Sequence, residues 1–447
     1  MATTIADDRT TQKGLRRSVI AGSIGVLVHW FDWAVYAYMA TTVADIFFPN
    51  QDGTASLLSV FAVFAIAFFV RPLGSVIFGH LGDRFGRKKT LSMVIISMAA
   101  GTLLLGLIPG YDTIGVTAPI LLVVARIIQG LAAGGEFGSA AAFLAEYSPA
   151  KRRGLGTSSI EVGSVLGFLL ASFVVWALHA TLSEEAIIDG GWRIPFLLTV
   201  PLALVGLYIR LKVEDTPEYR ALEELDTIPA SPVTEVFKNN RKQFFQTIGI
   251  ETFMNCTFYV VLVYLLTYQE EIVGLHPDQA ALLSTAASLV AIALIPLSGI
   301  ASDRVGRRPV LLGAAGLLIV GAVPLFLLMR QGSESAAFAA TAGLAAILAI
   351  ILGTHSATVA ELFPTRTRQS GLSMAYAIAG AAFAGTLPYI NTWLISATDD
   401  PMIPAYTLIV VGIVGLLTVL TIPETKGTDL LHESDVSAGG RPSAPVR

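Results

Sequence analysis

The chain has 447 residues, of which 54% are hydrophobic and 14% are charged; its net charge is −4 and its mean hydropathy is +0.68. Soluble domains carry about 25% charged residues, so this composition disfavours a cytosolic enzyme, a disordered chain and a nucleic-acid-binding protein. A single Cys256 excludes an intrachain disulfide and a Cys-rich metal site. The composition predicts a polytopic membrane protein surrounded by lipid, with no cofactor and no bound metal.

Twelve membrane spans are predicted, because a helix needs about 20 mostly apolar residues to cross about 30 Å of hydrocarbon. In chain order they lie near 19–42, 57–80, 90–108, 118–144, 155–178, 194–211, 244–267, 280–301, 309–329, 336–360, 370–396 and 404–422. The apolar runs are continuous rather than alternating, which excludes a membrane β-barrel. The predicted fold class is therefore an all-α bundle.

The distribution of cations predicts the orientation. Lys and Arg gather in the N-terminal tail, in the loops after even-numbered spans and in the C-terminal tail, whereas the other loops carry acids such as Glu184, Asp189 and Glu270. Cytoplasmic loops are the ones enriched in Lys and Arg. We therefore expect both termini in the cytoplasm.

Two motifs occur twice. Gly79-His-Leu-Gly-Asp-Arg-Phe-Gly-Arg-Lys88 returns 220 residues later as Gly299-Ile-Ala-Ser-Asp-Arg-Val-Gly-Arg-Arg308, and Ala145-Glu-Tyr-Ser-Pro149 returns 215 residues later as Ala360-Glu-Leu-Phe-Pro364. Nearly equal offsets predict a duplicated six-helix unit, a known transporter plan. The predicted parts are an N-terminal tail 1–18, a first bundle 19–212, a linker 213–242, a second bundle 243–423 and a C-terminal tail 424–447.

The repeated loops are candidates for conformational gating. Glycines permit sharp turns and close helix approach, and Asp83 and Asp303 can cap a helix start or pair with an arginine across the two halves. The alternative is that these basic loops only fix the orientation. The predicted gating residues are Asp83, Arg84, Arg87, Asp303, Arg304, Arg307, Glu146, Arg153, Glu361 and Arg368.

Ionisable residues within the spans are the leading site candidates, because a charge at bilayer depth is costly unless it is paired or hydrated. At 1.5 Å per helical residue, Asp32 lies about 20 Å and Arg126 and Gln129 about 22–27 Å from the cytoplasmic end. We therefore predict an Asp32–Arg126 pair. Arg71 and Glu136, both about 12–14 Å deep, form a plausible second pair.

A buried carboxylate that faces an arginine can exchange this partner for a proton when its surroundings change. The alternative is a permanent salt bridge that fixes helix register. Glu161 and Glu251 lie only one or two turns inside the membrane, where an interfacial position is the competing interpretation. The predicted substrate-binding candidates are Arg71, Arg126, Gln129, Trp30, Tyr36, Glu251 and Asn255.

At these residues the chain resembles the major facilitator superfamily and, within it, the metabolite:proton symporters. The matching stretches include Trp30-Phe-Asp32, Arg71-Pro-Leu-Gly74, the doubled Asp-Arg-x-Gly-Arg loops and Arg126-x-x-Gln-Gly130. Other segments are similar to proline/betaine transporters and to α-ketoglutarate and other organic-acid permeases. The resemblance implies proton-driven uptake across the cytoplasmic (inner) membrane by alternating access.

Two features depart from the family pattern. His29 stands where the family usually has Glu, and histidine titrates near neutrality, so the predicted proton carriers are Asp32, His29 and Glu136. The segment after Gly427 lacks the heptads of the coiled coil found in some betaine transporters, so osmotic gating is not expected.

The predicted function is symport of a small organic acid or zwitterion with protons. Three alternatives remain: a proton-antiport exporter, an uncoupled facilitator and a membrane sensor or receptor. The exporter is disfavoured because Gly163-Ser-Val-Leu-Gly167 lacks the Gly-Pro pair that such antiporters place in span five. The sequence fixes neither the substrate nor the oligomeric state.

Overall fold

The computed structural model describes residues 26–49, 52–74, 77–78, 87–134, 141, 144–145, 148–212 and 232–428. Within these ranges the regular structure is entirely helical. In chain order the helices are 26–38, α2 Ala40–Phe47, α3 Gly53–Phe69, α5 Arg87–Leu107, α6 Tyr111–Ile114, α7 Thr117–Ala132, the 3₁₀ turn η1 Ala150–Arg152, α9 Arg153–Thr181, α10 Glu184–Ala186, α11 Arg193–Lys212, α13 Pro232–Asn239, α14 Arg241–Phe258, α15 Leu265–Tyr268, α16 Pro277–Val305, α17 Arg307–Met329, α18 Glu334–Leu362, α19 Thr365–Ala379, α20 Leu387–Thr398 and α21 Ile403–Thr421. Four π-helical stretches complete the set: η2 Ile187–Gly191, η3 Tyr259–Tyr264, η4 Gln269–Val273 and η5 Gly380–Ala384.

Each predicted span overlaps a helix of the described residues. In the described ranges, eight helices are long and apolar enough to cross a membrane: Gly53–Gly74, Ala150–Thr181, Arg241–Val273, Pro277–Val305, Arg307–Met329, Glu334–Leu362, Ser370–Thr398 and Ile403–Thr421. A ninth forms if Glu184–Gly191 and Arg193–Tyr208, which are bent by 50°, count as one span, and Ile96–Leu107 and Thr117–Ala132 are shorter apolar helices. The first predicted span is described from residue 26, where residues 26–38 are helical.

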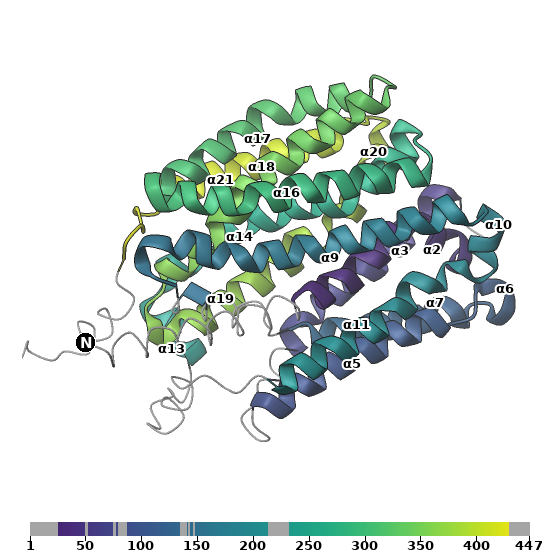
Figure 1. The fold of residues 1–447 in the computed structure, drawn as a ribbon, viewed down its shortest axis with the longest axis horizontal. Helices are drawn as coiled ribbons and strands as arrows, with labels where there is room; N and C mark the ends of the chain where they lie inside the picture. The colour runs from purple at the N-terminus through teal and green to yellow at the C-terminus, as the bar shows by residue number, and fades with distance from the viewer. Residues whose placement is uncertain are drawn as a thin grey trace, which may run out of the picture.

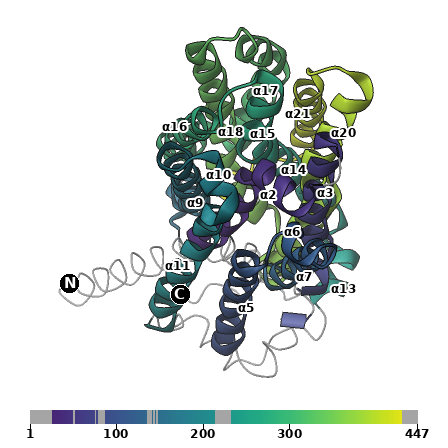
Figure 2. The same cartoon turned by 90° about the vertical axis from the view of Figure 1, so that its right-hand side faces the viewer.

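The helices form two groups that meet along α9 and α16. Figures 1 and 2 show α16, α17, α18 and α21 together on one side, and α5, α7 and α11 together on the other. Helix α9 of the first group lies against α16 of the second, and α14 packs against α18, α19 and α21. This arrangement leaves the facing surfaces of the two groups in contact through the middle of the molecule.

Glycines bring several helices into backbone contact. A Cβ atom on Gly167 of α9 would lie 2.6 Å from the carbonyl oxygen of Leu27, and one on Gly130 of α7 would lie 2.2 Å from that of Ala67 in α3. Neither space can hold a side chain, so these glycines set the helix separation. Gly130 and Gly167 are therefore positions of close helix packing.

Two ends of the molecule have different charge. We call the end where α9 and α17 begin, at Arg153 and Arg307, the basic end, because the repeated basic motifs lie there. The opposite end, which carries α6 and the acidic turn α10, is called the outer end. Figure 1 shows α13 at the basic end on its left and α6 and α10 at the outer end on its right.

Candidate functional site

Asp32 lies at the centre of a hydrogen-bonded group in the first half. Its carboxylate is buried and accepts a hydrogen bond from Thr102 Oγ1 at 2.6 Å. The amide nitrogen of Gln129 donates to both carboxylate oxygens, at 3.1 and 2.9 Å, and lies 2.8 Å from Thr102 Oγ1. Three helices, 26–38, α5 and α7, therefore fix the position of one carboxylate.

Gln129 connects Asp32 to Arg126. Nη1 of Arg126 donates to Oε1 of Gln129 at 2.9 Å. Arg126 and Gln129 are three residues apart on α7 and therefore share one helix face, which places the amide between the two charges. The prediction that these residues meet is correct, but the predicted direct ion pair is wrong: the contact runs through an amide.

The rest of the Arg126 guanidinium faces aromatic rings. Its Cζ lies 3.6 Å from the ring centroid of Tyr36 and 5.2 Å from that of Trp33. Nε and Nη2 are buried and have no hydrogen-bond partner among the described residues. An arginine has five N–H donors in a planar fork, so this cation retains donors that could bind an anion.

Arg71 lies on the other side of Trp33. Its Cζ is 4.2 Å from the Trp33 ring centroid and 4.1 Å from the ring centroid of Phe68. A desolvated cation–π contact is worth about 2 kcal/mol, so the rings offset part of the cost of two buried cations. Glu136, the predicted partner of Arg71, lies outside the described residues.

His29 and Trp30 occupy the turn before Asp32. The His29 ring stacks on Trp33 with a centroid distance of 6.1 Å, and Trp30 lies 5.0 Å from Phe258 of the second half. Tyr36 donates its hydroxyl hydrogen to the carbonyl oxygen of Val60 at 3.0 Å. Trp30 therefore joins the two halves, whereas Tyr36 ties its own helix to α3.

A second polar group joins the halves nearer the basic end. Glu161 of α9 accepts a hydrogen bond from Ser356 Oγ of α18 at 3.0 Å, and its Oε1 lies 3.7 Å from Nε2 of His355. Glu251 of α14 accepts from Nδ2 of Asn255 at 3.3 Å. Both carboxylates are buried, at 2% and 0% exposure, so neither lies on the surface of the described structure.

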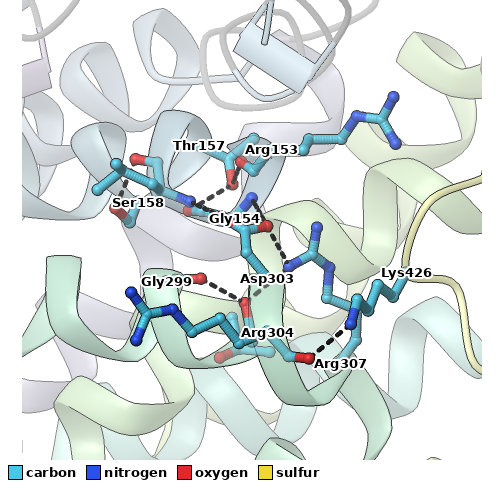
Figure 3. Close-up of polar contacts among 12 residues, drawn as sticks. Arg153, Gly154, Thr157, Ser158, Gly299, Asp303, Arg304, Arg307 and Lys426 are labelled. Atoms are coloured by element: carbon cyan, nitrogen blue, oxygen red, sulfur yellow. Dashed lines mark hydrogen bonds and ion pairs between the residues drawn. The ribbon is translucent and has the colours of Figure 1, made fainter. Parts of the chain in front are cut away.

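The basic end holds a network between the halves, which we call the seam and define by Arg153, Gly154, Asp303, Arg307 and Glu361. Figure 3 labels the first four of these residues. Asp303 accepts hydrogen bonds from the backbone N–H groups of Gly154 and Leu155, at 2.8 and 3.0 Å. A carboxylate at a helix N-terminus is favoured by the helix dipole. Asp303 of the second half therefore caps α9 of the first.

Glu361 is the other centre of the seam. Its Oε1 lies 2.9 Å from Nη1 of Arg153 and 3.1 Å from Nη2 of Arg307, and its Oε2 accepts from Thr425 at 2.7 Å. Arg307 also pairs with Asp303 at 2.7 Å. Each of these four charged groups therefore touches one of opposite sign.

The two halves contain the same arginine contact. Nε of Arg153 donates to the carbonyl oxygen of Ala145 at 3.1 Å, and Nε of Arg368 donates to that of Ala360 at 2.8 Å. The two arginines are 215 residues apart, as are the two alanines. The duplicated motif thus forms a duplicated structure, which we call the arginine bracket.

The remaining predicted gating residues are only partly described. Arg304 is exposed, and its carbonyl oxygen accepts from Nζ of Lys426. Asp83, Arg84 and Glu146 lie outside the described residues, and Arg87 is described only as the first residue of α5.

Sequence reasoning missed three polar contributors. Thr102 was not predicted, because a hydroxyl in a membrane helix usually bonds its own backbone, as Thr102 also does to Met98 at 3.1 Å. Glu424 accepts from the backbone N–H of Arg307 at 2.8 Å, and Thr425 reaches Glu361. Both follow the last span and were assigned to the tail. Within the described ranges, no group of three or more His, Cys, Asp or Glu side chains could hold a metal ion.

A family model described as "Sugar (and other) transporter" matches the chain twice, over residues 18–227 and 220–435. The proline/betaine transporter of Escherichia coli K12 is 37% identical over 437 residues, covering 96% of this chain and 86% of that protein. The glycine betaine/proline/ectoine/pipecolic acid transporter of Dickeya dadantii strain 3937 is 36% identical with the same coverage.

Solved structures share the fold. The proton:xylose symporter XylE bound to 6-bromo-6-deoxy-D-glucose aligns with a TM-score of 0.73 at 20% identity, over 95% of this chain and 99% of that one. The partially occluded inward-open form of the Escherichia coli xylose transporter gives 0.72 at 20% identity, over 94% and 100%. The predicted twelve-helix fold is therefore confirmed.

Proposed function

The chain belongs to the sugar (and other) transporter family of the major facilitator superfamily, and from this premise we propose that it carries a small zwitterion or organic acid into the cell together with protons. It is a transporter rather than an enzyme. The substrate crosses by alternating access, in which the two six-helix halves open in turn to each side of the membrane.

One observation carries the proton coupling: the buried chain from Asp32 through Gln129 to Arg126. Asp32 accepts from Thr102 and Gln129, and Gln129 accepts from Arg126. These bonds are strong because they involve charged groups. An acid connected to a cation through one amide can respond to the occupancy of that cation.

The exchange follows from the donors of each group. When Asp32 takes up a proton, it loses its charge, and its hydrogen bonds from Thr102 and Gln129 weaken. The Gln129 amide can then turn, which releases Nη1 of Arg126 as well as its unpartnered Nε and Nη2 for a substrate carboxylate. Proton binding and anion binding thereby favour each other.

Arg71 is a second candidate for the substrate carboxylate. It shares the Trp33 ring with Arg126, so the two guanidiniums lie on one aromatic surface. His29, which stacks on the same ring, is a second candidate proton carrier, and Glu136 remains a third.

The seam acts as the cytoplasmic gate in this proposal. It joins Asp303, Arg307 and Glu361 of the second half to the start of α9 in the first. The two matches of the family model support the division into bundles 19–212 and 243–423. The basic loops favour a cytoplasmic position for this end and for both termini.

The named relatives favour a zwitterion. The names of both relatives specify proline and betaine, and one adds ectoine and pipecolic acid. All four compounds combine a carboxylate with a cationic nitrogen centre. The buried guanidiniums fit the carboxylate end of such a molecule.

Uptake into proteoliposomes tests the proposal. The purified chain would be tested with radiolabelled glycine betaine, proline, α-ketoglutarate, citrate and shikimate, with and without an imposed inward proton gradient. We expect a zwitterion to accumulate above its external concentration only with the gradient. Accumulation that persists unchanged with a protonophore would overturn proton coupling, and equilibration without accumulation would favour the uncoupled facilitator.

A further inference from the structure

The two carboxylates between the halves, Glu161 and Glu251, are not accounted for by the proton-coupling group. Glu161 lies eight residues from the start of α9, and Glu251 lies ten residues from the start of α14. At 1.5 Å per residue they are about 12 and 15 Å from the basic end. Two acids, one from each half, therefore lie at similar depth.

Neither acid has a cationic side chain to neutralise it among the described residues. Nε2 of His355, which is charged only if protonated, lies 3.7 Å from Oε1 of Glu161, and Glu251 has no salt bridge within the described part of the chain. Oε1 of Glu251 is buried and has no hydrogen-bond partner within the described ranges. An unpaired buried carboxylate costs several kcal/mol, so a cation that enters between the halves would relieve this cost.

Aromatic rings lie on the same helix faces as the acids, about 10.5 Å further toward the outer end. Seven residues are almost two helical turns, so Phe168 is on the face of Glu161 and Phe258 is on the face of Glu251. The two rings are 5.1 Å apart and both contact Trp30, at 5.7 and 5.0 Å. Carboxylates and aromatic faces that line one space are the combination that binds substituted ammonium groups.

The opposite pole of a zwitterion is also present. The ring of Tyr259 lies 5.3 Å from that of Phe68, over which Arg71 lies, and 6.3 Å from that of Trp30, so one side chain connects the guanidinium surface to the rings. A substrate with a carboxylate at one end and a cationic nitrogen at the other matches this order of charges.

We propose that Glu161 and Glu251 form a subsite for the ammonium group of the substrate, and that the rings of Trp30, Phe168 and Phe258 close its outer side. The inference rests on the proposed transport function and narrows its substrate class to zwitterions. Because the two acids come from opposite halves, the ammonium group bridges the halves and favours the state in which they are close together.

Two probes of nearly the same shape test the subsite. Glycine betaine and 3,3-dimethylbutanoate share a carboxylate and a trimethylated centre, but the centre is a cationic nitrogen in the first and a neutral carbon in the second. Equilibrium binding of each to the purified full chain would be measured without a proton gradient. We expect glycine betaine to bind at least about tenfold more tightly than its carbon analogue.

Substitution of the acids should remove this preference. In Glu251→Gln we expect glycine betaine to lose at least about tenfold in affinity, while 3,3-dimethylbutanoate binds as well as before or better. Glu161→Gln should act in the same direction, which protects the test if one variant folds poorly. Glu185→Gln, an exposed glutamate at the outer end, is the matched control and should change neither affinity.

Three outcomes would overturn the subsite. They are equal binding of both probes to the unmodified chain, equal loss of both in the glutamine variants, and binding of α-ketoglutarate with no binding of glycine betaine or proline. None of them depends on a gradient, so the subsite can fail while proton-coupled uptake of another substrate stands. Conversely, if transport proves not to be coupled to protons but glycine betaine still binds more tightly than its carbon analogue, only the proposed proton step is contradicted.

Discussion

The seam differs from the hydrogen-bonded residues Asp32, Gln129 and Arg126, which we call the mid-membrane group. Both contain acids and arginines, but in opposite arrangements. At the seam, Glu361 is in direct contact with Arg153 and Arg307 at 2.9 and 3.1 Å. In the middle of the bundle, an amide separates Asp32 from Arg126. Direct pairing stabilises one arrangement of the halves, whereas interrupted pairing leaves an acid and a cation able to accept a proton and an anion.

The comparison also predicts how much free energy a mutation costs in each region. Removal of one partner from a buried ion pair costs about 3–5 kcal/mol, because the other charge is left behind. The mid-membrane group already contains buried donors without a hydrogen-bond partner, since Nε and Nη2 of Arg126 have none in the described chain. The seam is therefore expected to respond to mutation through conformation, and the middle through binding and coupling.

The largest effect should come from Glu361→Gln. It leaves Arg153 without its carboxylate, and Arg307 keeps only Asp303, so the closed basic end should weaken by about 3–5 kcal/mol. A thiol introduced at the buried Ser158, in a Cys256→Ser background, should then be alkylated at least about a hundredfold faster. Glu334→Gln at the exposed start of the same helix should leave the rate unchanged. An unaltered rate in Glu361→Gln would remove the distinction between the regions.

Asp32→Asn should impair proton-coupled accumulation of the substrate but not the exchange of substrate across the membrane. The variant loses charged hydrogen bonds with Thr102 and Gln129, each worth about 1.5–3 kcal/mol. Accumulation driven by a pH gradient should fall about tenfold to a hundredfold, while counterflow between substrate on the two sides continues. Asp112→Asn at the outer end is the control. Normal gradient-driven accumulation in Asp32→Asn would show that the proton is carried elsewhere.

Gly154→Ala should open the seam without removing a charge. Its Cβ would lie 2.7 Å from the carbonyl oxygen of Gly299 and 2.5 Å from Ser302 Oγ. Overpacking of this kind costs about 1–3 kcal/mol, so alkylation at position 158 should rise, but less than in Glu361→Gln. Gly313→Ala, where nothing lies within 4 Å of the added atom, serves as the control. A rise equal to that of the control would mean that the contact does not limit opening.

Gly101→Ala should give the smallest effect, at the mid-membrane group. The new Cβ would lie 2.6 Å from Cγ of Gln129, and this flexible side chain would have to move. A loss of about 1 kcal/mol in the Gln129 hydrogen bonds should lower gradient-driven accumulation by about fivefold and leave the alkylation rate at position 158 unchanged. Gly316→Ala is the comparison variant. A change in the alkylation rate instead would show that the two regions are not independent.

Hydropathy predicted the helices well because bilayer thickness fixes their length. The last predicted span, 404–422, corresponds to α21 Ile403–Thr421. The seventh, 244–267, is longer in the structure, Arg241–Val273. Its added outer turns contain Glu270, which is partly buried and accepts from Thr41 of the other half. Hydropathy assigned these polar residues to a loop, because it does not include the contact with the other half that accommodates them in a helix.

The sequence predicted how deep in the membrane the site residues lie, but not which way their side chains face. Axial arithmetic brought Asp32, Gln129 and Arg126 to one level, yet it contains no information on which side of α7 each group faces in the bundle. For the same reason Glu161 and Glu251 could be read as interfacial. Their burial depends on α9 meeting α18 and on α14 facing the centre, which only the packed structure supplies.

The arginine bracket carries a consequence for the speed of switching. Arg153–Ala145 and Arg368–Ala360 each lie within one half, so neither backbone contact has to break when the halves rock apart. Each half can therefore move without losing this internal contact. The activation barrier would then lie in the contacts between the halves, so engineering those contacts should speed or slow turnover while the melting temperature of each bundle stays nearly constant.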